Sequence, residues 1–430
     1  MSRKMVLTAV LVSCLAACGG GGGSAGRPSG GGGGGGGGSS SSGGGTPQLP
    51  PPASAPSLAA SISARFGVAN YRIGAAVQTT QLTGTTGTLL TRHFSSLTAE
   101  YQMKPDIVWP NATGTSGGTA QPAPQANFAP GDQLADFAAA NTLGLRCHTL
   151  LWHQTAPAWF FAGDTSNPTN YRATVQQRLR EYIRAVMFHW PDCYAWDVVN
   201  EVATDTPNAI NPYRTDSPWY IAYATGGADG SEYVRDAFLF ATQARTAMGR
   251  NDSNLKLMLN DYNTEIAGKR ANVLRIVQDV MNAGTGADLD GVGHQFHLSI
   301  NADVAQVTAA LTAVEALGAG LVNHVTELDV SIYDDPGNCF SQRAIPPCAA
   351  DYGASPPQAV LSDQARLYRA LFNAFNRPSV TSITTWGVSD AATWLNTFPV
   401  ARTNRPLLFD TAGDPKWAFW AVVDPNISIP

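Results

Sequence analysis

Residues 196–201 read Trp-Asp-Val-Val-Asn-Glu, an apolar and partly β-branched run that ends on a carboxylate. Residues 324–330 repeat the pattern as His-Val-Thr-Glu-Leu-Asp-Val, with Glu327 inside the run. Both runs are typical of buried strands. Carboxylates are among the residues least often buried without a partner, so Glu201 and Glu327 at strand ends indicate a functional role. Either glutamate alone fits a cap or half of an ion pair equally well, and the indication comes from the pair.

Eight such runs alternate with longer segments of helical periodicity, for example residues 171–189. This alternation predicts a parallel sheet, and eight repeats predict an α/β fold of the closed (β/α)8 TIM-barrel type. Residues 417–423 are expected to form a final outer helix. The predicted strands are Tyr71–Val77, His93–Thr98, Leu145–Trp152, Tyr194–Asn200, Leu255–Asn260, Gly291–His297, Leu321–Val330 and Ser382–Val388.

Polar and aromatic side chains gather at the carboxyl ends of these runs, the face on which barrels carry their active sites. Side-chain alternation puts Glu327 and Asp329 on one side of their strand, and Gln295 and His297 on one side of the strand before it. We expect the His297 imidazole between Glu327 and Asp329, where it would hold a proton and orient both carboxylates. The other polar or aromatic residues at strand ends are Glu100, Lys104, His148, Trp152, His153, Asn200, Asn260, Asp261, Trp386 and Asp390.

The charge balance of the chain is modest, with 27 Lys and Arg against 32 Asp and Glu. No basic run occurs beyond the first few residues, which argues against nucleic acid as a partner. No spacing of Cys and His residues suggests zinc, and neither a metal nor another cofactor is expected. The folded part is expected to be a monomeric domain.

The N-terminus has the pattern of an export signal. A short basic segment precedes an apolar run that is too short to span a bilayer and ends Leu-Ala-Ala-Cys at Cys18. This ending resembles a bacterial lipoprotein signal, which implies that residues 1–18 form the signal and that Cys18 carries lipid. An ordinary signal peptide cut after Ala17 is the alternative, and both export the protein. By the same resemblance, Gly19 favours anchoring at the outer membrane or cell surface, the only membrane contact expected.

Residues 19–57 consist largely of Gly, Ser and Pro and are predicted to be a disordered tether, so that residues 58–430 form the folded domain. Four cysteines remain after the signal and Cys18 are set aside, in an oxidising compartment. Cys339 and Cys348 flank a Pro-rich loop and are expected to form a local disulfide. Cys147 and Cys193 lie in two apolar strands, where a bridge and two free buried thiols are equally compatible with the sequence.

Six motifs together resemble glycoside hydrolase family 10, whose members are mostly endo-1,4-β-xylanases on a (β/α)8 barrel. The resemblance runs in order from about residue 60 to the C-terminus, and jointly the motifs are highly specific, although any one alone is weak. The motifs are Trp-Asp-Val-Val-Asn-Glu (196–201), His-Thr-Leu-Leu-Trp-His-Gln (148–154), Leu-Asn-Asp-Tyr-Asn-Thr-Glu (259–265), Gly-Val-Gly-His-Gln-Phe-His (291–297), Thr-Glu-Leu-Asp (326–329) and Thr-Trp-Gly-Val-Ser-Asp (385–390).

Two carboxylates that flank one bond are what glycoside hydrolysis requires. The resemblance implies that Glu201 is the acid/base and Glu327 the nucleophile of a retaining mechanism, with His297 and Asp329 supporting Glu327. It also implies that Asp197, on the same strand face as Glu201, tunes the acid/base together with His153. The residues that it places around the sugar are Asn200 at the 2-hydroxyl, Gln295 and His148 in the same subsite, Glu100 and Lys104 at further hydroxyls, and Trp386, Trp394 and Trp152 as an aromatic wall.

One residue departs from the family pattern. Tyr101 stands between Glu100 and Lys104 where the family usually has Asn, so the second glycone subsite can differ in its preference for xylose or glucose. The expected function is a surface-anchored endo-1,4-β-xylanase acting on xylan. The alternatives are another β-1,4-glycanase specificity, such as mixed-linkage glucan or cellulose, a non-catalytic glycan-capture lipoprotein, and a structural surface lipoprotein.

Overall fold

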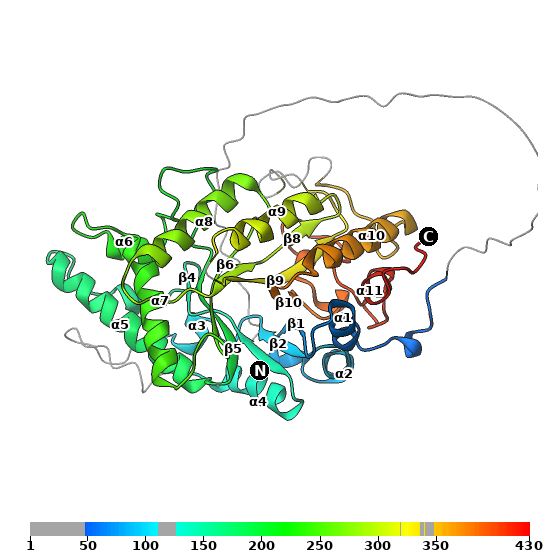
Figure 1. Cartoon of the computed structure of the whole chain (residues 1–430), viewed down its shortest axis with the longest axis horizontal. Coiled ribbons are helices and arrows are strands. Elements are labelled where there is room, and N and C mark those ends of the chain that lie inside the picture. Colours follow the sequence, from blue (N-terminus) through cyan, green and yellow to red (C-terminus); the bar gives the residue numbers. More distant parts are fainter. Residues whose placement is uncertain (1–47, 111–125, 319, 336–338, 340–347) are drawn as a thin grey trace, which may run out of the picture.

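The computed structural model describes residues 48–110, 126–318, 320–335, 339 and 348–430 (Figure 1). The predicted signal peptide, the lipidation site Cys18 and residues 19–47 of the predicted tether lie outside these residues. Over the part that is described, no helix combines the length and the apolar character needed to cross a membrane.

Eight parallel strands form a closed barrel, as the sequence predicts. Each strand pairs with its neighbour, and the pairing of the last strand with the first closes the circle. Two short strands, β4 (Leu151–Trp152) and β8 (His297–Ser299), extend the sheet by pairing with β5 and β9. The barrel strands are β1 (Arg72–Val77), β2 (Ser96–Ala99), β3 (Gly144–Cys147), β5 (Cys193–Asn200), β6 (Lys256–Asp261), β7 (Gly291–His294), β9 (Val322–Ser331) and β10 (Val380–Thr385).

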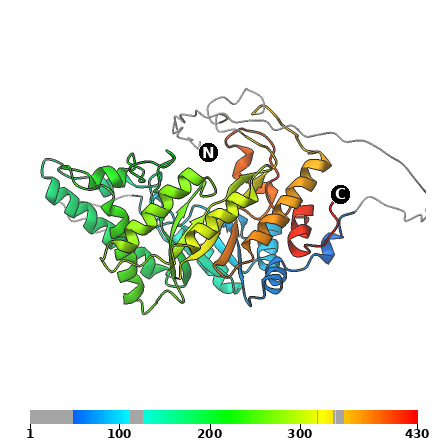
Figure 2. The ribbon, with the colours of Figure 1, turned by 45° about the horizontal axis from the view of Figure 1, so that its top comes forward.

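Helices surround the barrel in both ribbon views (Figures 1 and 2). The first helix packs against the last, and Arg65 Nη1 donates to the Val422 carbonyl oxygen, so the two ends of the domain meet. The helices are α1 (Leu58–Phe66), α2 (Gly84–His93), α3 (Pro105–Val108), α4 (Ala129–Ala140), α5 (Pro168–His189), α6 (Pro218–Tyr223), α7 (Glu232–Ala247), α8 (Ala267–Asn282), α9 (Val304–Glu315), α10 (Gln358–Phe375) and α11 (Trp417–Val423).

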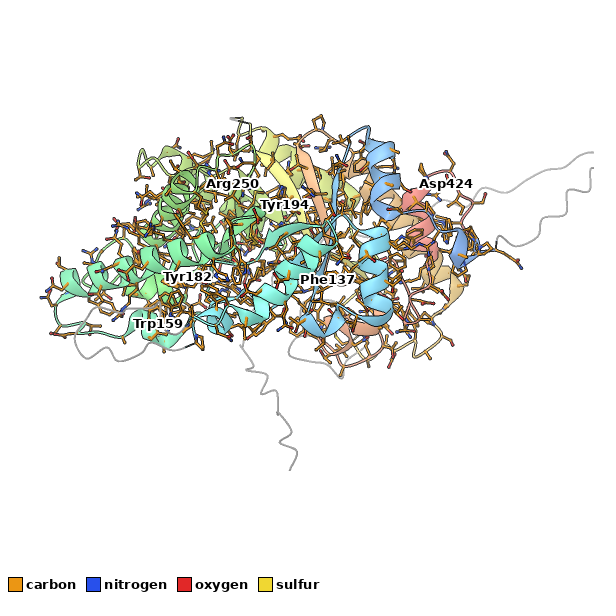
Figure 3. All side chains as sticks on the ribbon, turned by 90° about the horizontal axis from the view of Figure 1, so that it is seen from below. Phe137, Trp159, Tyr182, Tyr194, Arg250 and Asp424 are labelled. Atoms are coloured by element: carbon orange, nitrogen blue, oxygen red, sulfur yellow. A yellow bond between two sulfur atoms is a disulfide. The ribbon has the colours of Figure 1, made fainter. Side chains whose placement is uncertain are left out.

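The longest helix, α5, shows why the sequence forms this outer layer. Its buried residues Val175, Leu179, Ile183 and Val186 recur three or four positions apart, so they lie on one face of the helix. The same face carries Tyr182, which Figure 3 shows on the side of the molecule near Trp159. Burial of this apolar face against the barrel drives the packing of the helix.

Four predicted strands differ from the observed ones by more than one residue at an end. The strand predicted as Ser382–Val388 instead runs from Val380 to Thr385. The strand predicted from His93 begins at Ser96, because His93 ends α2. The run 145–152 divides into β3 and β4, with an irregular turn between them. The run 291–297 divides into β7 and β8, because Phe296 has a left-handed φ of 49° and interrupts the extended backbone. The last two differences occur on the face where the polar residues gather.

The folded domain begins before residue 58, which corrects the predicted end of the tether. Residues Pro52–Ser54 form a short 3-10 helix, and Ala55 is buried. Arg92 Nη2 donates to the carbonyl oxygen of Ala55 at 2.9 Å. The Pro-rich composition misled the prediction, because proline fits a short helical turn as well as an extended linker.

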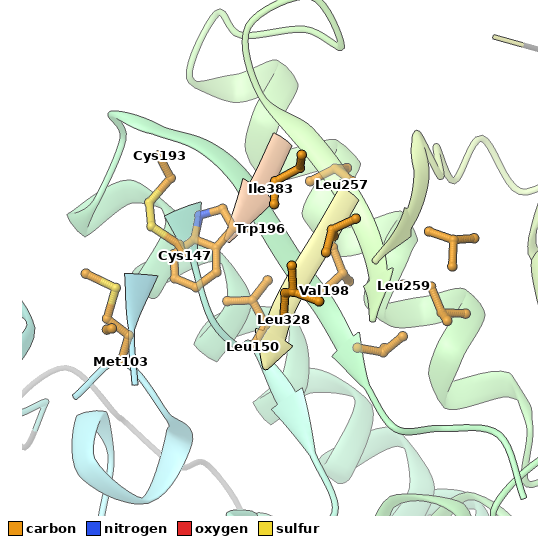
Figure 4. Packing of buried hydrophobic residues seen from close by; sticks show 14 of the residues in the cluster. Met103, Cys147, Leu150, Cys193, Trp196, Val198, Leu257, Leu259, Leu328 and Ile383 are labelled. Atoms are coloured by element: carbon orange, nitrogen blue, oxygen red, sulfur yellow. A yellow bond between two sulfur atoms is a disulfide. The ribbon is translucent and has the colours of Figure 1, made fainter. Parts of the chain in front are cut away.

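Two disulfides connect the four cysteines of the domain. Cys147 at the end of β3 bonds to Cys193 at the start of β5, beside the indole of Trp196 in the packed interior (Figure 4). This bridge decides between the two alternatives left open by the sequence. Cys339 and Cys348 form the predicted local disulfide.

Candidate active site

Glu201 follows the last residue of β5, at the carboxyl end of the barrel. Its backbone has a φ of 59°, so the chain turns sharply out of the strand there. Two hydrogen bonds hold this turn. The Glu201 N–H donates to the Asn260 carbonyl oxygen at 2.8 Å, and Arg214 Nε donates to the Glu201 carbonyl oxygen at 3.1 Å. The glutamate is therefore fixed by its neighbours in a conformation that favours glycine or asparagine.

The Glu201 carboxyl receives two hydrogen bonds. Trp152 Nε1 donates to Oε2 at 2.7 Å, and Gln295 Nε2 donates to Oε1 at 3.1 Å. Burial raises the pKa of Glu201 above its ordinary value, and the negative charges of Asp261 and Glu327 add to the rise, while the two hydrogen bonds oppose it. A carboxyl group with a raised pKa can keep its proton and donate it.

Glu327 lies within β9, and its side chain is buried. Asn260 Nδ2 donates to Glu327 Oε1 at 2.8 Å, and His297 Nε2 lies 3.2 Å from Oε2. Burial opposes ionisation, but the hydrogen bond from His297 and the charge of Lys104 hold the pKa of Glu327 below its ordinary value. These surroundings favour the ionised form of Glu327 and the protonated form of Glu201.

His297 lies between Glu327 and Asp329, as the alternation of β9 predicts. Its Nδ1 is 3.0 Å from Asp329 Oδ2, which also accepts a hydrogen bond of 2.8 Å from Trp394 Nε1. Burial works against a charge on His297, yet the two carboxylates outweigh it and raise the pKa of His297 to about 10. The imidazolium donates from both ring nitrogens and thereby orients Glu327.

Side-chain amides connect the two glutamates. Asn200 Oδ1 accepts from Asn260 Nδ2 at 2.9 Å and from Gln295 Nε2 at 3.2 Å. Asn260 bonds to Glu327 and Gln295 bonds to Glu201, so the three amides form one path between the carboxyl groups. With its oxygen occupied, Asn200 can offer its Nδ2 donor to a sugar hydroxyl. Asn260 was among the polar strand-end residues, but the sequence did not indicate its partners.

Asp197 contacts other residues than the sequence implied. Arg146 donates to its two oxygens at 2.6 and 2.5 Å, and His148 Nδ1 lies 2.9 Å from Oδ2. Burial opposes ionisation of Asp197, but Arg146 and the His148 hydrogen bond lower its pKa to about 2. The strand face that Asp197 was expected to share with Glu201 is interrupted, because a register shift between Asp197 and Val199 and the left-handed Glu201 break the strand alternation. Asp197 instead holds His148 with Nε2 as the nitrogen left for a ligand.

His153 lines the same narrow pocket as Glu201, beside Trp152. Burial, together with the nearby charge of Arg214, lowers the pKa of His153 to about 3, so the ring is neutral. The charges that act on it belong to Arg214, Asp205 and Lys269. His153 therefore lies near Glu201, whereas Asp197 contacts Arg146 and His148.

Lys104 occupies the middle of the site. Its Nζ lies 4.5 Å from the Trp152 ring centre and 5.9 Å from that of Trp386. Burial lowers the pKa of Lys104, and the charges of Glu327, Glu201 and Glu100 oppose this. Cations over aromatic faces are stabilised, so the two tryptophan rings help to hold the ammonium group in the site.

Glu100 and Tyr101 form the adjoining rim. Glu100 Oε2 accepts a hydrogen bond of 3.1 Å from Gln78 Nε2, and burial raises the pKa of Glu100. Tyr101 is 40% exposed, its hydroxyl donates to Asp106 Oδ2 at 2.5 Å, and its ring centre lies 5.4 Å from Lys104 Nζ. The residue that departs from the family pattern therefore borders the site.

Aromatic rings line one wall of the site in a continuous series. Trp386 lies 5.5 Å from His148 and 6.3 Å from His297 between ring centres, and Trp394 lies 4.9 Å from His297. Phe398, which the sequence did not single out, stacks on Trp394 at 5.1 Å. Flat apolar rings match the faces of pyranose sugars.

Among the described residues, no group of three or more His, Cys, Asp and Glu side chains is arranged to hold a metal ion.

A protonated carboxyl and an ionised carboxylate at the mouth of one barrel are the pair that glycoside hydrolysis uses. The model of glycosyl hydrolase family 10 matches residues 60–425. A thermostable celloxylanase of Thermoclostridium stercorarium is 37% identical over 372 residues, which cover 83% of this chain and 85% of that protein. Endo-1,4-beta-xylanase C of Paenibacillus barcinonensis is 35% identical over 371 residues, but this chain spans only 31% of its length.

Solved structures agree with these relatives. Xylanase B from Clostridium stercorarium F9 superposes with a TM-score of 0.70 at 38% sequence identity, covering 86% of this chain and 100% of that one. The match extends over the whole barrel, and the six motifs quoted from the sequence fall within the residues that the family model covers. The chain belongs to glycosyl hydrolase family 10.

Proposed function

We propose that this chain is an exported endo-1,4-β-xylanase that hydrolyses internal β-1,4 bonds of xylan with retention, through a covalent glycosyl-enzyme. The observation that carries the proposal is a pair of buried carboxyl groups at one barrel mouth whose pKa values are shifted in opposite directions by their neighbours. Burial, Asp261 and Glu327 favour the acid form of Glu201, whereas His297 and Lys104 favour the ionised form of Glu327 against its burial. Retaining and inverting mechanisms both need one group in each state, and the proposal of retention is supported by the resemblance to the family.

In the first step the Glu327 carboxylate attacks the anomeric carbon, and Glu201 gives its proton to the departing glycosidic oxygen. In the second step Glu201, now ionised, takes a proton from water as the water oxygen attacks the same carbon and releases Glu327. His297 holds the Glu327 oxygen at 3.2 Å, so one carboxylate orientation faces the sugar. Each step leaves charge and protons balanced.

The choice of xylan is supported by the names of the relatives, and two observations favour a test of glucan beside it. One relative is named a celloxylanase. Tyr101, on the rim of the site, is the residue that differs from the family pattern. A screen of reducing-end release from xylan, arabinoxylan, glucuronoxylan and glucan separates the two specificities. No release from any of them would leave glycan capture or a structural role.

Replacement of each glutamate tests the two roles. Glu327→Ala should lose activity on every substrate, because no glycosyl-enzyme can form. Glu201→Ala should still form the intermediate from an activated aryl xyloside, and azide should rescue its turnover to a β-glycosyl azide, since azide attacks without a general base. Azide rescue of Glu327→Ala to an α-azide would reverse the roles. Full activity of both variants would refute the proposal.

Export and anchoring are a separate part of the proposal, supported by the Leu-Ala-Ala-Cys ending at Cys18 and by the Gly- and Ser-rich segment after it. Cys18→Ser should move active enzyme from the membrane fraction to the soluble fraction of the producing bacterium. A wild-type chain that is already soluble and without lipid would contradict the anchor but not the hydrolase.

A further inference from the structure

A buried cluster of charged residues contacts the backbone at Glu201 and just after it. Lys269 Nζ is 3.0 Å from Asp261 Oδ1 and 2.9 Å from Asp205 Oδ1. Arg214 Nη2 is 3.1 Å from Asp205 Oδ2. Asp261 ends β6 and is fully buried, whereas the Asp205 side chain is 43% exposed. The cluster alternates in sign, and Asp261 is its most buried negative group.

Asp261 also holds the backbone that follows Glu201. Its Oδ2 accepts a hydrogen bond of 3.0 Å from the Ala203 N–H, and its Oδ1 accepts one of 3.0 Å from the Tyr262 N–H. The preceding residue, Asn260, accepts the Glu201 N–H through its carbonyl oxygen. Consecutive residues of β6 therefore fix the left-handed turn on both sides of the Glu201 side chain.

The charged groups that face Glu201 come from several elements. The charges of Asp261, Glu327 and Lys104 interact with Glu201, and Arg214 donates to the Glu201 carbonyl oxygen. His153, from the loop after β4, is neutral. After burial, the charge of Asp261 is a larger cause of the raised pKa of Glu201 than the charge of Glu327.

We propose that Asp261 is a positioning residue for the acid/base, a fixed negative charge that keeps Glu201 protonated before the first step and basic in the second. This inference rests on the proposed roles of the two glutamates. It adds a distinction between two negative neighbours. The charge of Glu327 disappears when it is bonded to the sugar, whereas the charge of Asp261 persists throughout. Asp261 is therefore the neighbour that maintains the basicity of Glu201 when water must be deprotonated.

The test compares Asp261→Asn with Asp205→Asn in the full chain. Both changes replace a carboxylate of the same cluster by an amide. Of the two residues, Asp261 is the one that accepts the Ala203 N–H and whose charge raises the pKa of Glu201. In Asp261→Asn the alkaline limb of the kcat/KM profile against pH should move to lower pH, because Glu201 loses its proton more easily. With an aryl xyloside whose second step limits turnover, kcat should also fall several-fold. In Asp205→Asn the alkaline limb should stay at the wild-type position.

Equal shifts in both variants, or none in Asp261→Asn, would overturn the inference. The proposal requires that Asp261 be ionised, and this can be tested independently. Burial raises the pKa of Asp261, whereas the charge of Lys269 opposes the rise. Carboxyl 13C titration of the wild-type chain should show Asp261 ionised where Glu201 is still protonated, and a neutral Asp261 there would refute the proposal even if Asp261→Asn fails to fold. Failure of the proposed function differs, because then Glu201→Ala would keep the wild-type alkaline limb and full activity.

Discussion

The Asn260 amide donates to the Glu327 carboxylate at 2.8 Å, although 67 residues separate them in the chain. The orientation of that amide is set from the strand of Glu327 itself, because Thr326 Oγ1 donates to Asn260 Oδ1 at 2.7 Å. The same Nδ2 group contacts Asn200. Asn260 thus connects β5, β6 and β9 by hydrogen bonds and helps to fix the position of the Glu327 carboxylate.

Asn260→Ala should lower kcat/KM by roughly 10–100-fold, the usual cost of removing a group that orients a reactive residue. The loss should appear in kcat, because the Glu327 carboxylate would keep its negative charge but lose the hydrogen bond that orients it. Steady-state kinetics on xylan measure this. Thr326→Val is the matched control, since it leaves the donor and removes only the group that orients it, and its loss should be smaller. A change confined to KM in Asn260→Ala would contradict the prediction.

The charge on His297 should make stability depend on pH at the alkaline side. Its pKa is raised to about 10 in the folded state, against about 6.5 in an unfolded chain. A raised pKa stabilises the fold fully below about pH 6.5, and the contribution is lost as the pH rises towards about 10. At pH 6, His297→Gln should lower the free energy of unfolding by about 1.5–3 kcal/mol, the range for hydrogen bonds to charged groups, because the His297 side chain is only partly buried.

Urea unfolding at a series of pH values measures this difference, which should shrink between about pH 6.5 and about pH 10. His189→Gln is the control, because His189 forms a half-exposed pair with Asp132 at 2.7 Å. That pair should contribute about 0–1 kcal/mol. A difference for His297→Gln that does not vary with pH would show that packing, not charge, accounts for its effect.

The sequence predicted one group of contacts and missed another. Glu327, Asp329 and His297 meet as expected, because β8 pairs with β9 in a register that places His297 opposite Asp329. The strand face that Asp197 was expected to share with Glu201 is interrupted, since the register shift in β5 and the left-handed backbone of Glu201 undo the period of two on which that expectation depends.

Other contacts between side chains from different strands of the barrel could not be predicted from the sequence, for a different reason. A local pattern shows that a polar side chain stands at a strand end, but not which of the other seven ends it reaches. The Cys147 to Cys193 bridge was open for the same reason, because the pairing of β3 with β5 depends on a register that shifts between Leu145 and Arg146. The fold class needed only the alternation of strands and helices, which is local.

Removal of the Cys147 to Cys193 bridge by a double change to Ala should lower the free energy of unfolding by about 2–5 kcal/mol. The bridge spans 46 positions, so its loss frees a long loop in the unfolded chain. The same double change at Cys339 and Cys348 is the control, because that bridge spans only 9 positions and should contribute less. Denaturant unfolding of both variants gives the comparison, and a larger loss for the shorter loop would contradict it.

Tyr101→Asn should raise activity on cello-oligosaccharides relative to xylo-oligosaccharides, by roughly 10-fold for one accommodated group. The tyrosine ring, held by Asp106, lies beside Lys104 on the rim of the site. A smaller residue there should leave more room for the extra hydroxymethyl group of glucose. The ratio of kcat/KM for the two substrates measures the effect. Tyr101→Phe keeps the ring and removes only the hydroxyl, so its ratio should remain that of the wild type. An equal ratio in all three chains would exclude Tyr101 from substrate choice.

The left-handed backbone of Glu201 sets two selective pressures against each other at one position. The conformation suits Gly or Asn, and a longer side chain there costs on the order of 1 kcal/mol. A library of variants at position 201 that is sorted for heat resistance alone should therefore become enriched in Gly and Asn. The same library sorted for turnover should retain Glu. Deep sequencing of both pools would show that Glu is kept at position 201 for turnover, although its backbone conformation there is unfavourable for stability.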